Sequence, residues 1–310
     1  MAVATTAATG VGNPPVTAAR RRRSSALPYV LVLPAIIVLG AMLGYPLVRL
    51  GTMSLQEYGL PQVFGKPAPW VGFANFRAIL EDSYFWTVLW RTLIFCFVNV
   101  ALTMVLGVLI ALLLEALGKR MRLFVSASLI IAWAMPALTA TIVWQWLFDT
   151  EYGLVNWALD RQGESWWADQ LTFFMVATII VVWMGIPFIA FTTYAALTQI
   201  PTDMIEAAKL DGAGFRQTFR HIVFPAVKPI LLILTALSVI WDFRVFTQIY
   251  VLQRAGGITR DTNLLGVFAY RISIGENRFD IGAAVAIVML LITALLTVAY
   301  LRAMLKQEEV

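Results

Sequence analysis

The sequence predicts an all-α, polytopic membrane protein with six transmembrane helices. Of its 310 residues, 60% are hydrophobic and only 13% are charged, whereas a soluble domain is about 45–50% apolar and about a quarter charged. Six segments are long enough to cross the hydrocarbon core, which takes about 20 apolar residues in helical form. A soluble protein with very large buried helices would need polar faces, and these segments lack them.

The six spans are expected at about 27–50, 86–114, 123–148, 171–197, 223–251 and 281–305. All of them contain proline or glycine, which transmembrane helices tolerate where neighbouring helices pack closely and re-satisfy the backbone. We therefore expect residues 26–310 to form one packed six-helix domain. Examples of these residues are Pro34, Pro46, Gly107, Pro136, Gly185, Pro187 and Gly282.

Residues 1–25 differ from the rest, because they are small and polar and end in the cluster Arg20–Arg23. Such a segment has too little apolar surface to order itself, so it is expected to be a disordered basic cytoplasmic tail. A signal peptide also joins an arginine cluster to an apolar stretch. Here, however, the apolar stretch is longer than about 20 residues and no small-residue cleavage site follows it, so we expect a retained first span.

Basic residues near the span ends predict the orientation, because they favour the cytoplasmic side. The loop at 149–170 holds Arg161 against several acids and is expected outside, which puts both termini in the cytoplasm. The 252–280 loop holds four arginines, although the span count also places it outside; a functional use of these charges is one explanation. The residues that mark the cytoplasmic side are Arg20 to Arg23, Lys119, Arg120, Arg122, Lys209, Arg216, Arg220, Arg302 and Lys306.

The inventory of chemically reactive residues excludes several functions. One cysteine, Cys96, and one histidine, His221, are too few for a disulfide framework or a thiolate metal cluster. No phosphate-binding loop is present, so any ATP and magnesium must be bound by another chain. No catalytic constellation indicates a membrane enzyme, and we expect no metal or cofactor in this chain. The basic loops explain the net charge of +5 without nucleic acid.

The polar stretch EAAKLDGAG at 206–214 separates two apolar segments. Asp203 and Glu206 fit an N-cap with its reciprocal partner, and Gly212 fits a left-handed helix stop. A second helix should follow with one apolar face and end or bend at Pro225. Two short helices joined by a glycine would form a compact cytoplasmic hairpin. From the residues alone, an interfacial helix lying on lipid headgroups is equally possible.

The wider stretch IPTDMIEAAKLDGAGFRQTFRHIVFPAVKP resembles the coupling loop of ABC importer permeases, the membrane subunits of binding-protein-dependent uptake systems. This resemblance implies a type I ABC importer permease fold, with a cytoplasmic coupling loop at about 200–225 that inserts into a cleft of a separate ATPase. The matching positions implied to couple to the ATPase are Glu206, Ala207, Ala208, Asp211, Gly212 and Ala213, and the match continues at Phe219, Ile222, Pro225 and Pro229.

Two further stretches resemble carbohydrate importers within this family: MPALTATIVWQWLFDTEYGLVNWAL and WDFRVFTQIYVLQRAGGITRDTNLLGVFAY. The usual Thr-x-Gly-Gly-Pro of the outer loop is replaced by residues 254–258, Arg-Ala-Gly-Gly-Ile. The resemblance implies half of a permease pair, a heterodimer in the cytoplasmic membrane of a bacterium or archaeon. It also implies two copies of an ATPase subunit, which bind ATP and magnesium, and an extracytoplasmic sugar-binding protein. Lipid is the remaining partner.

Charged residues within a span are costly and indicate function. The main cluster lies in the fifth span at Trp241, Asp242, Arg244 and Gln248, where aromatic and polar groups suit a sugar, and the resemblance implies that this segment faces the translocation path. Alternatively, Asp242 and Arg244 serve structure or gating; residues two apart do not share a helix face. An ion-gradient-driven secondary transporter would instead show inverted repeats. Further path candidates are Asn99, Thr103, Trp144, Gln145 and Tyr194.

Overall fold

The structure, a computed structural model, describes residues 27–308 and is helical between its connecting turns. The tail predicted at 1–25 lies outside the described residues. The chain divides into two units at Val48, and each is described by itself. The described part holds five helices that are long and apolar enough to cross a membrane, and six spans if one bent pair counts as a single span. This agrees with the predicted all-α, six-span architecture.

The described part of the first unit contains helix α1 (Leu27–Leu39), a π-helical turn (Gly40–Gly44) and the start of α2 (Tyr45–Ser54). Together they form a candidate span, Tyr29–Ser54. The side chains of α1 are apolar on all sides, as expected for a helix that faces lipid or other apolar helices. Pro34 is accommodated inside α1.

The second unit begins with an outer segment that contains the short helices α3 (Leu60–Val63) and α4 (Ala74–Glu81). The buried Asn75 side chain fastens this segment, because its amide donates to the carbonyl oxygens of Ser54 at 3.0 Å and Gln56 at 2.9 Å. Buried polar groups need such partners. An isolated β-bridge between Gly59 and Arg278 joins the same segment to the end of the 252–280 loop.

Helices α5 (Ser83–Ala116) and α9 (Gln170–Leu197) form the most extensive helix pair of this unit. Glycines allow the close approach. A Cβ atom on Gly107 would lie 2.5 Å from Cγ2 of Ile189, and one on Gly185 would lie 2.8 Å from Cγ2 of Thr103. Small residues at membrane helix contacts allow backbones to approach in this way. The predicted close packing of the spans is therefore confirmed for this pair.

The third predicted span is not one helix. The structure has α6 (Lys119–Ala134) and α7 (Ala137–Leu147), bent by 104° at the break. Pro136, which the sequence marked as an interruption of the predicted 123–148 span, explains the break. A proline lacks the N–H that a helix interior needs, and it disfavours helical geometry in the preceding residue. Met135 accordingly has an extended ψ of 128°.

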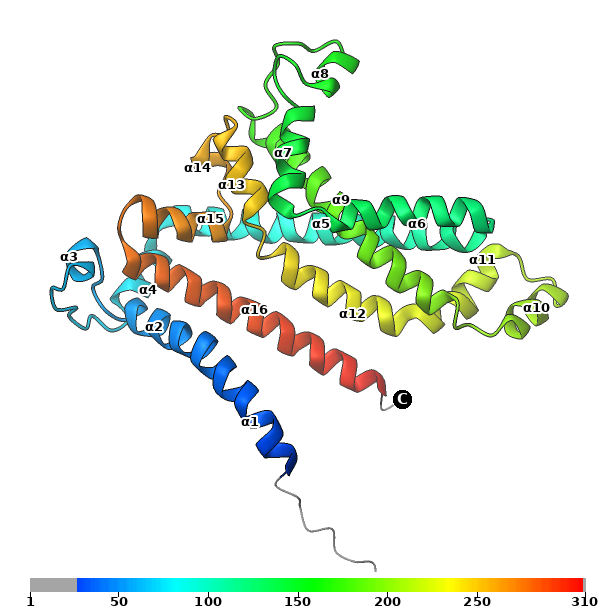
Figure 1. Cartoon of the computed structure of the whole chain (residues 1–310), viewed down its shortest axis with the longest axis horizontal. Helices are drawn as coiled ribbons and strands as arrows, with labels where there is room; N and C mark the ends of the chain where they lie inside the picture. The colour runs from blue at the N-terminus through cyan, green and yellow to red at the C-terminus, as the bar shows by residue number, and fades with distance from the viewer. Residues whose placement is uncertain (1–26, 309–310) are drawn as a thin grey trace, which may run out of the picture. The chain divides into compact units, whose positions relative to one another are not determined.

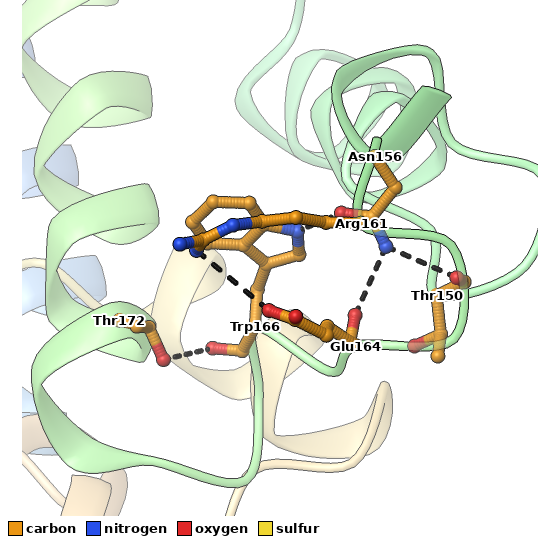
Figure 2. Close-up of polar contacts among 6 residues, drawn as sticks. All are labelled: Thr150, Asn156, Arg161, Glu164, Trp166 and Thr172. Atoms are coloured by element: carbon orange, nitrogen blue, oxygen red, sulfur yellow. Dashed lines mark hydrogen bonds and ion pairs between the residues drawn. The ribbon is translucent and has the colours of Figure 1, made fainter. Parts of the chain in front are cut away.

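An outer loop follows α7, carries helix α8 (Leu154–Ala158) and is held by the buried side chain of Asn156. The Asn156 amide donates to the carbonyl oxygens of Thr150 at 3.0 Å and Glu164 at 2.9 Å, and its oxygen accepts from the Trp166 indole (Figure 2). Thr172 donates to the Trp166 carbonyl at 2.9 Å, which ties the loop to the start of α9. This loop is therefore a folded element.

The second half of the unit continues through α10 (Thr202–Leu210), α11 (Phe215–Thr218), α12 (Phe224–Asp242), α13 (Thr247–Arg254), α14 (Thr259–Thr262), α15 (Leu265–Tyr270) and α16 (Phe279–Glu308). Figure 1 shows the α5–α6 connection, the α10–α11 segment and the C-terminal end of α16 at one end of this unit, with α4, α15 and the start of α16 at the other. Within this unit, the basic 117–122 and 198–222 loops that predicted the cytoplasmic side therefore share one end.

Candidate functional site

The first candidate site is the hairpin of α10 and α11. Helix α10 begins where predicted, but its N-cap is Pro201, which makes no side-chain cap bond. The predicted capping role of Asp203 is therefore wrong. Asp203 lies in the first turn instead, where a carboxylate stabilises the positive end of the helix dipole. The proline, whose fixed φ suits entry into a helix, takes the boundary position.

The predicted left-handed stop is confirmed at Gly212, which has φ of +79°. The Gly212 N–H donates to the carbonyl of Lys209 at 3.1 Å, and the Ala213 N–H donates to the carbonyl of Ala208 at 2.9 Å. These two bonds form a Schellman motif, which satisfies the carbonyl groups at the end of α10. Gly212 therefore sets the angle at which the chain turns towards α11.

The second helix of the hairpin runs into the fifth span without ending at Pro225. Helix α11 continues as a π-helical turn, η2 (Phe219–Val223), and then as α12. Pro225 lies in the first turn of α12. Because proline cannot donate a hydrogen bond to the turn before it, the wider π-helical turn falls next to it. The hairpin is thus mechanically continuous with the span.

The residues that resemble a coupling loop lie mostly on the surface of this hairpin. Glu206, Ala207, Asp211 and Gly212 are exposed, and Ala208 and Ala213 are half-buried. Two apolar side chains outside this set of matching positions are also strongly exposed: Leu210 at 89% and Phe215 at 79%. Apolar tips on a polar hairpin favour insertion into a cleft over a purely solvated surface.

The second candidate site is a cavity in the fifth span. The predicted span at 223–251 lies within the candidate span Phe215–Arg254, but its helix is interrupted at residues 243–246, between α12 and α13. Non-helical backbone at membrane depth is tolerated where it is buried in protein or lines a cavity. A cavity of about 310 Å³ lies at this break. It is lined by Trp133, Val181, Met184, Gly185, Phe188, Trp241, Asp242, Arg244, Val245, Phe246, Thr247 and Gln248.

All four residues of the predicted main cluster line this cavity. The Trp241 ring is 49% exposed and meets Phe188 edge-on, with the ring centroids 5.1 Å apart. The Gln248 side chain is 9% exposed and its amide contacts the sulfur of Met184 at 3.6 Å. Among the described residues, Asp242 and Arg244 form no ion pair with each other or with any other side chain. The wall thus offers aromatic faces beside a carboxylate, a guanidinium and an amide.

The other predicted path residues are not among those that line the cavity. Trp144 packs between Phe148 and Trp183. Asn99 is fully buried and bonds within α5 to the carbonyl of Phe95. The remaining three are Gln145, which is half-buried, Tyr194, whose ring lies 5.6 Å from the Arg122 guanidinium, and Thr103, which packs on Gly185.

Sequence reasoning missed Trp133 and Phe188 as cavity residues. Trp133 is three residues before Pro136, and Phe188 directly follows Pro187. Both prolines mark helix interruptions in the sequence, but an interruption does not indicate whether the neighbouring aromatic ring faces lipid, protein or a cavity. The side on which each ring lies depends on the 104° bend between α6 and α7 and on the α5–α9 packing.

Comparison with known proteins places this architecture in a family. A family model described as the binding-protein-dependent transport system inner membrane component matches residues 103–307. The diacetylchitobiose uptake system permease protein DasB of Streptomyces coelicolor is 44% identical over 306 residues, which cover 97% of this chain and 93% of that protein. The trehalose/maltose transport system permease protein MalF of Thermococcus litoralis is 32% identical over 292 residues, which cover 93% and 96%.

Solved structures share the fold. One is a bacterial ABC transporter involved in the import of the acidic polysaccharide alginate, with a TM-score of 0.76, 21% identity and coverage of 89% of this chain and 95% of that one. Its complex with an alginate pentasaccharide-bound periplasmic protein also gives a TM-score of 0.76, at 20% identity and with 88% and 92% covered. The chain therefore belongs to the family of binding-protein-dependent transport system inner membrane components, and is a multi-pass inner-membrane permease subunit of an ABC importer that carries no ATPase domain of its own.

Proposed function

We propose that this permease carries an oligosaccharide or a sugar derivative and that the cavity at the break between α12 and α13 lines its path. The importer works as a complex with a binding protein. Two relatives are named for sugar uptake, of diacetylchitobiose at 44% identity and of trehalose and maltose at 32% identity. The first of these favours an N-acetylated disaccharide as the sugar to test before others.

The observation that carries the proposal is the chemistry of the cavity wall. Trp241 offers an exposed ring face on which a sugar ring can stack, and Asp242 and Gln248 provide a carboxylate and an amide for hydroxyl groups. Ligand sites combine apolar and aromatic walls with a few polar groups in this way. Asp242 has no ion pair among the described residues, so its oxygens remain available for charge-assisted hydrogen bonds.

The α10–α11 hairpin is proposed to dock on the ATPase. Its exposed tips, Leu210 and Phe215, would enter a cleft of that subunit, and the unbroken passage from α11 through η2 into α12 would carry the motion towards the cavity. The complete importer would then contain this chain, a second and different permease subunit, two ATPase subunits that bind ATP and magnesium, and an extracytoplasmic sugar-binding protein.

Reconstitution of the complete complex in lipid vesicles tests this function. The N-acetylated disaccharide, maltose, an amino acid and an inorganic cation are each added with the binding protein. The proposal expects a sugar to accelerate ATP hydrolysis and to accumulate inside the vesicles. Acceleration by the amino acid or the cation alone would contradict the sugar assignment, and sugar uptake driven by an ion gradient without ATP would contradict ATP coupling.

A further inference from the structure

The segment between the fifth and sixth spans carries four arginines, Arg254, Arg260, Arg271 and Arg278, on the side predicted to be outside. Cations are normally depleted there. The ion pairs among the described residues are Arg77 with Glu81 and Arg161 with Glu164, so none of the four is neutralised within this part of the chain. We therefore expect the positive charge of these arginines to serve a function outside the membrane-spanning helices.

Two of these arginines line one pocket of about 590 Å³. It lies among α5, α14, α15 and the π-helical turn η3 (Arg271–Gly275), at the end of the second unit opposite the α10–α11 hairpin (Figure 1). The pocket is lined by Tyr84, Thr259, Arg260, Asn263, Phe268, Arg271, Ile272, Gly275 and Glu276. Its only carboxylate among these described residues is that of Glu276, which is exposed.

A buried amide holds Arg271 in place. Gln253 is 6% exposed, and its oxygen accepts from Nη2 of Arg271 at 3.1 Å. The Gln253 amide donates to the side-chain oxygens of Thr262 and Asn263, both at 3.1 Å. The Asn263 amide nitrogen in turn donates to the Tyr84 hydroxyl at 3.0 Å. The guanidinium of Arg271 is thus oriented by a fixed network.

Tyr84 connects the second arginine to the same network. Its hydroxyl donates to the Arg260 carbonyl at 2.8 Å, and the Arg260 guanidinium lies 5.8 Å from the centre of the Tyr84 ring. A third arginine, Arg91, stabilises the backbone of this wall. Its Nη1 donates to the carbonyl oxygens of Arg260 and Asn263 at 3.2 Å each. The pocket therefore has a positive wall whose side chains are held by hydrogen bonds and ring contacts.

Arg271 retains unused hydrogen-bonding capacity. A guanidinium has five N–H donors arranged as a planar fork, of which one bonds to Gln253. Its Nε is buried and has no partner among the described residues. Leaving a charged donor unpaired is costly, and the planar fork matches the two oxygens of a carboxylate better than a point charge does. Arg271 is half-buried and lines the pocket, so its remaining N–H groups on Nη1 and Nη2, and not the covered Nε, are the donors that a carboxylate from outside the chain would meet.

We infer that this pocket is a socket for the carboxylate of an acidic side chain on the extracytoplasmic binding protein, engaged when that protein docks on the permease. The inference rests on the proposed function, because it needs a binding protein that delivers substrate from outside. Position and charge support it: the socket is at the end of the unit opposite the proposed ATPase hairpin, and its two arginines complement an acidic partner. Such pairs raise association rates and fix the register of docking.

The test uses the complete complex reconstituted in discs of uncharged lipid. Its readout is the concentration of binding protein that gives half-maximal stimulation of ATP hydrolysis. Arg271→Gln should raise this concentration by more than about tenfold, because it removes one partner of a buried charge pair, while the maximal rate is kept. Arg271→Lys should give an intermediate value. Arg260→Gln removes an exposed guanidinium that only contacts a ring, so it preserves the buried network and should still raise the concentration several-fold.

Glu276→Gln provides the matched control, because Glu276 lines the same pocket and is the alternative counter-charge. The socket predicts an unchanged or lower half-maximal concentration for this variant. Wild-type values for both arginine variants in intact complexes would overturn the inference. So would a rise in Glu276→Gln equal to that of Arg271→Gln, or an effect seen only with anionic lipid, which would assign the pocket to a phosphate headgroup. Failure of the sugar assignment is distinguishable, since stimulation by the binding protein is read whichever substrate it carries.

Discussion

Gly212 offers a sharp test of the hairpin as a coupling element. It has φ of +79°, and a Cβ atom added to it would meet no other atom within 4 Å. Substitution therefore acts through backbone conformation and not through a clash inside this chain. Valine and asparagine have similar sizes but differ in this respect, because asparagine visits the left-handed region and a β-branched residue rarely does.

The expected magnitude follows from this geometry. A left-handed conformation costs an ordinary residue about 1–2 kcal/mol relative to glycine. That cost lowers the ratio of the closed hairpin to opened conformations by roughly 5- to 30-fold. Gly212→Val should therefore reduce ATPase retention and sugar uptake by up to this factor. Gly212→Asn should retain most of both.

The assay measures ATP-driven uptake in reconstituted vesicles, together with the amount of ATPase that copurifies with the permease, each normalised to inserted permease. A well-inserted Gly212→Val variant with wild-type uptake and wild-type ATPase retention would refute the coupling role of the turn. Equal losses in the valine and asparagine variants would also refute it, because they would indicate steric exclusion at the partner surface instead of backbone strain.

Two further predictions concern packing and orientation. Gly107→Ala should lower the thermal stability of the permease, because its Cβ would lie 2.5 Å from Cγ2 of Ile189 and overpacking costs about 1–3 kcal/mol; Gly51→Ala, which meets no atom within 4 Å, is the matched control, and equal melting temperatures would contradict the close α5–α9 contact. In a Cys96→Ala background, a cysteine at Gln162 should react with an impermeant thiol reagent added to intact cells, whereas one at Arg120 should react only after permeabilisation; the reverse pattern would overturn the orientation.

The number of spans followed from composition because hydrophobic length depends on local sequence alone. The bends and breaks within the spans did not follow from composition. Pro136 was recognised as an interruption, but the 104° bend between α6 and α7 is set by how both helices pack on their neighbours. The break after Asp242 had no proline or glycine to indicate it. It depends on the tertiary contacts of the segments on either side, which hydropathy does not report.

Some residues of the candidate sites were predictable from the sequence, and others were not. Gly212 was predictable, since the residue type and the conformation correspond closely. The grouping of Trp241, Asp242 and Gln248 was predictable because polar residues in a span are costly enough to indicate a site. Phe188 and Trp133 were missed, since an aromatic residue in a membrane helix faces lipid, protein or cavity with the same local sequence. Only the packing of α9 against α12 places Phe188 beside Trp241.

The measurement that tests the central claim most directly is the amount of sugar transported per ATP hydrolysed by Asp242→Ala, compared with Asp242→Glu and wild type in intact reconstituted complexes. A charged hydrogen bond contributes about 1.5–3 kcal/mol, so the alanine variant should lose about 10- to 100-fold in transport. ATP hydrolysis and complex yield should persist, and the glutamate variant should recover part of the transport. If transport, ATP hydrolysis and complex yield instead fall together, Asp242 stabilises the bundle and the cavity at the α12–α13 break does not line the path.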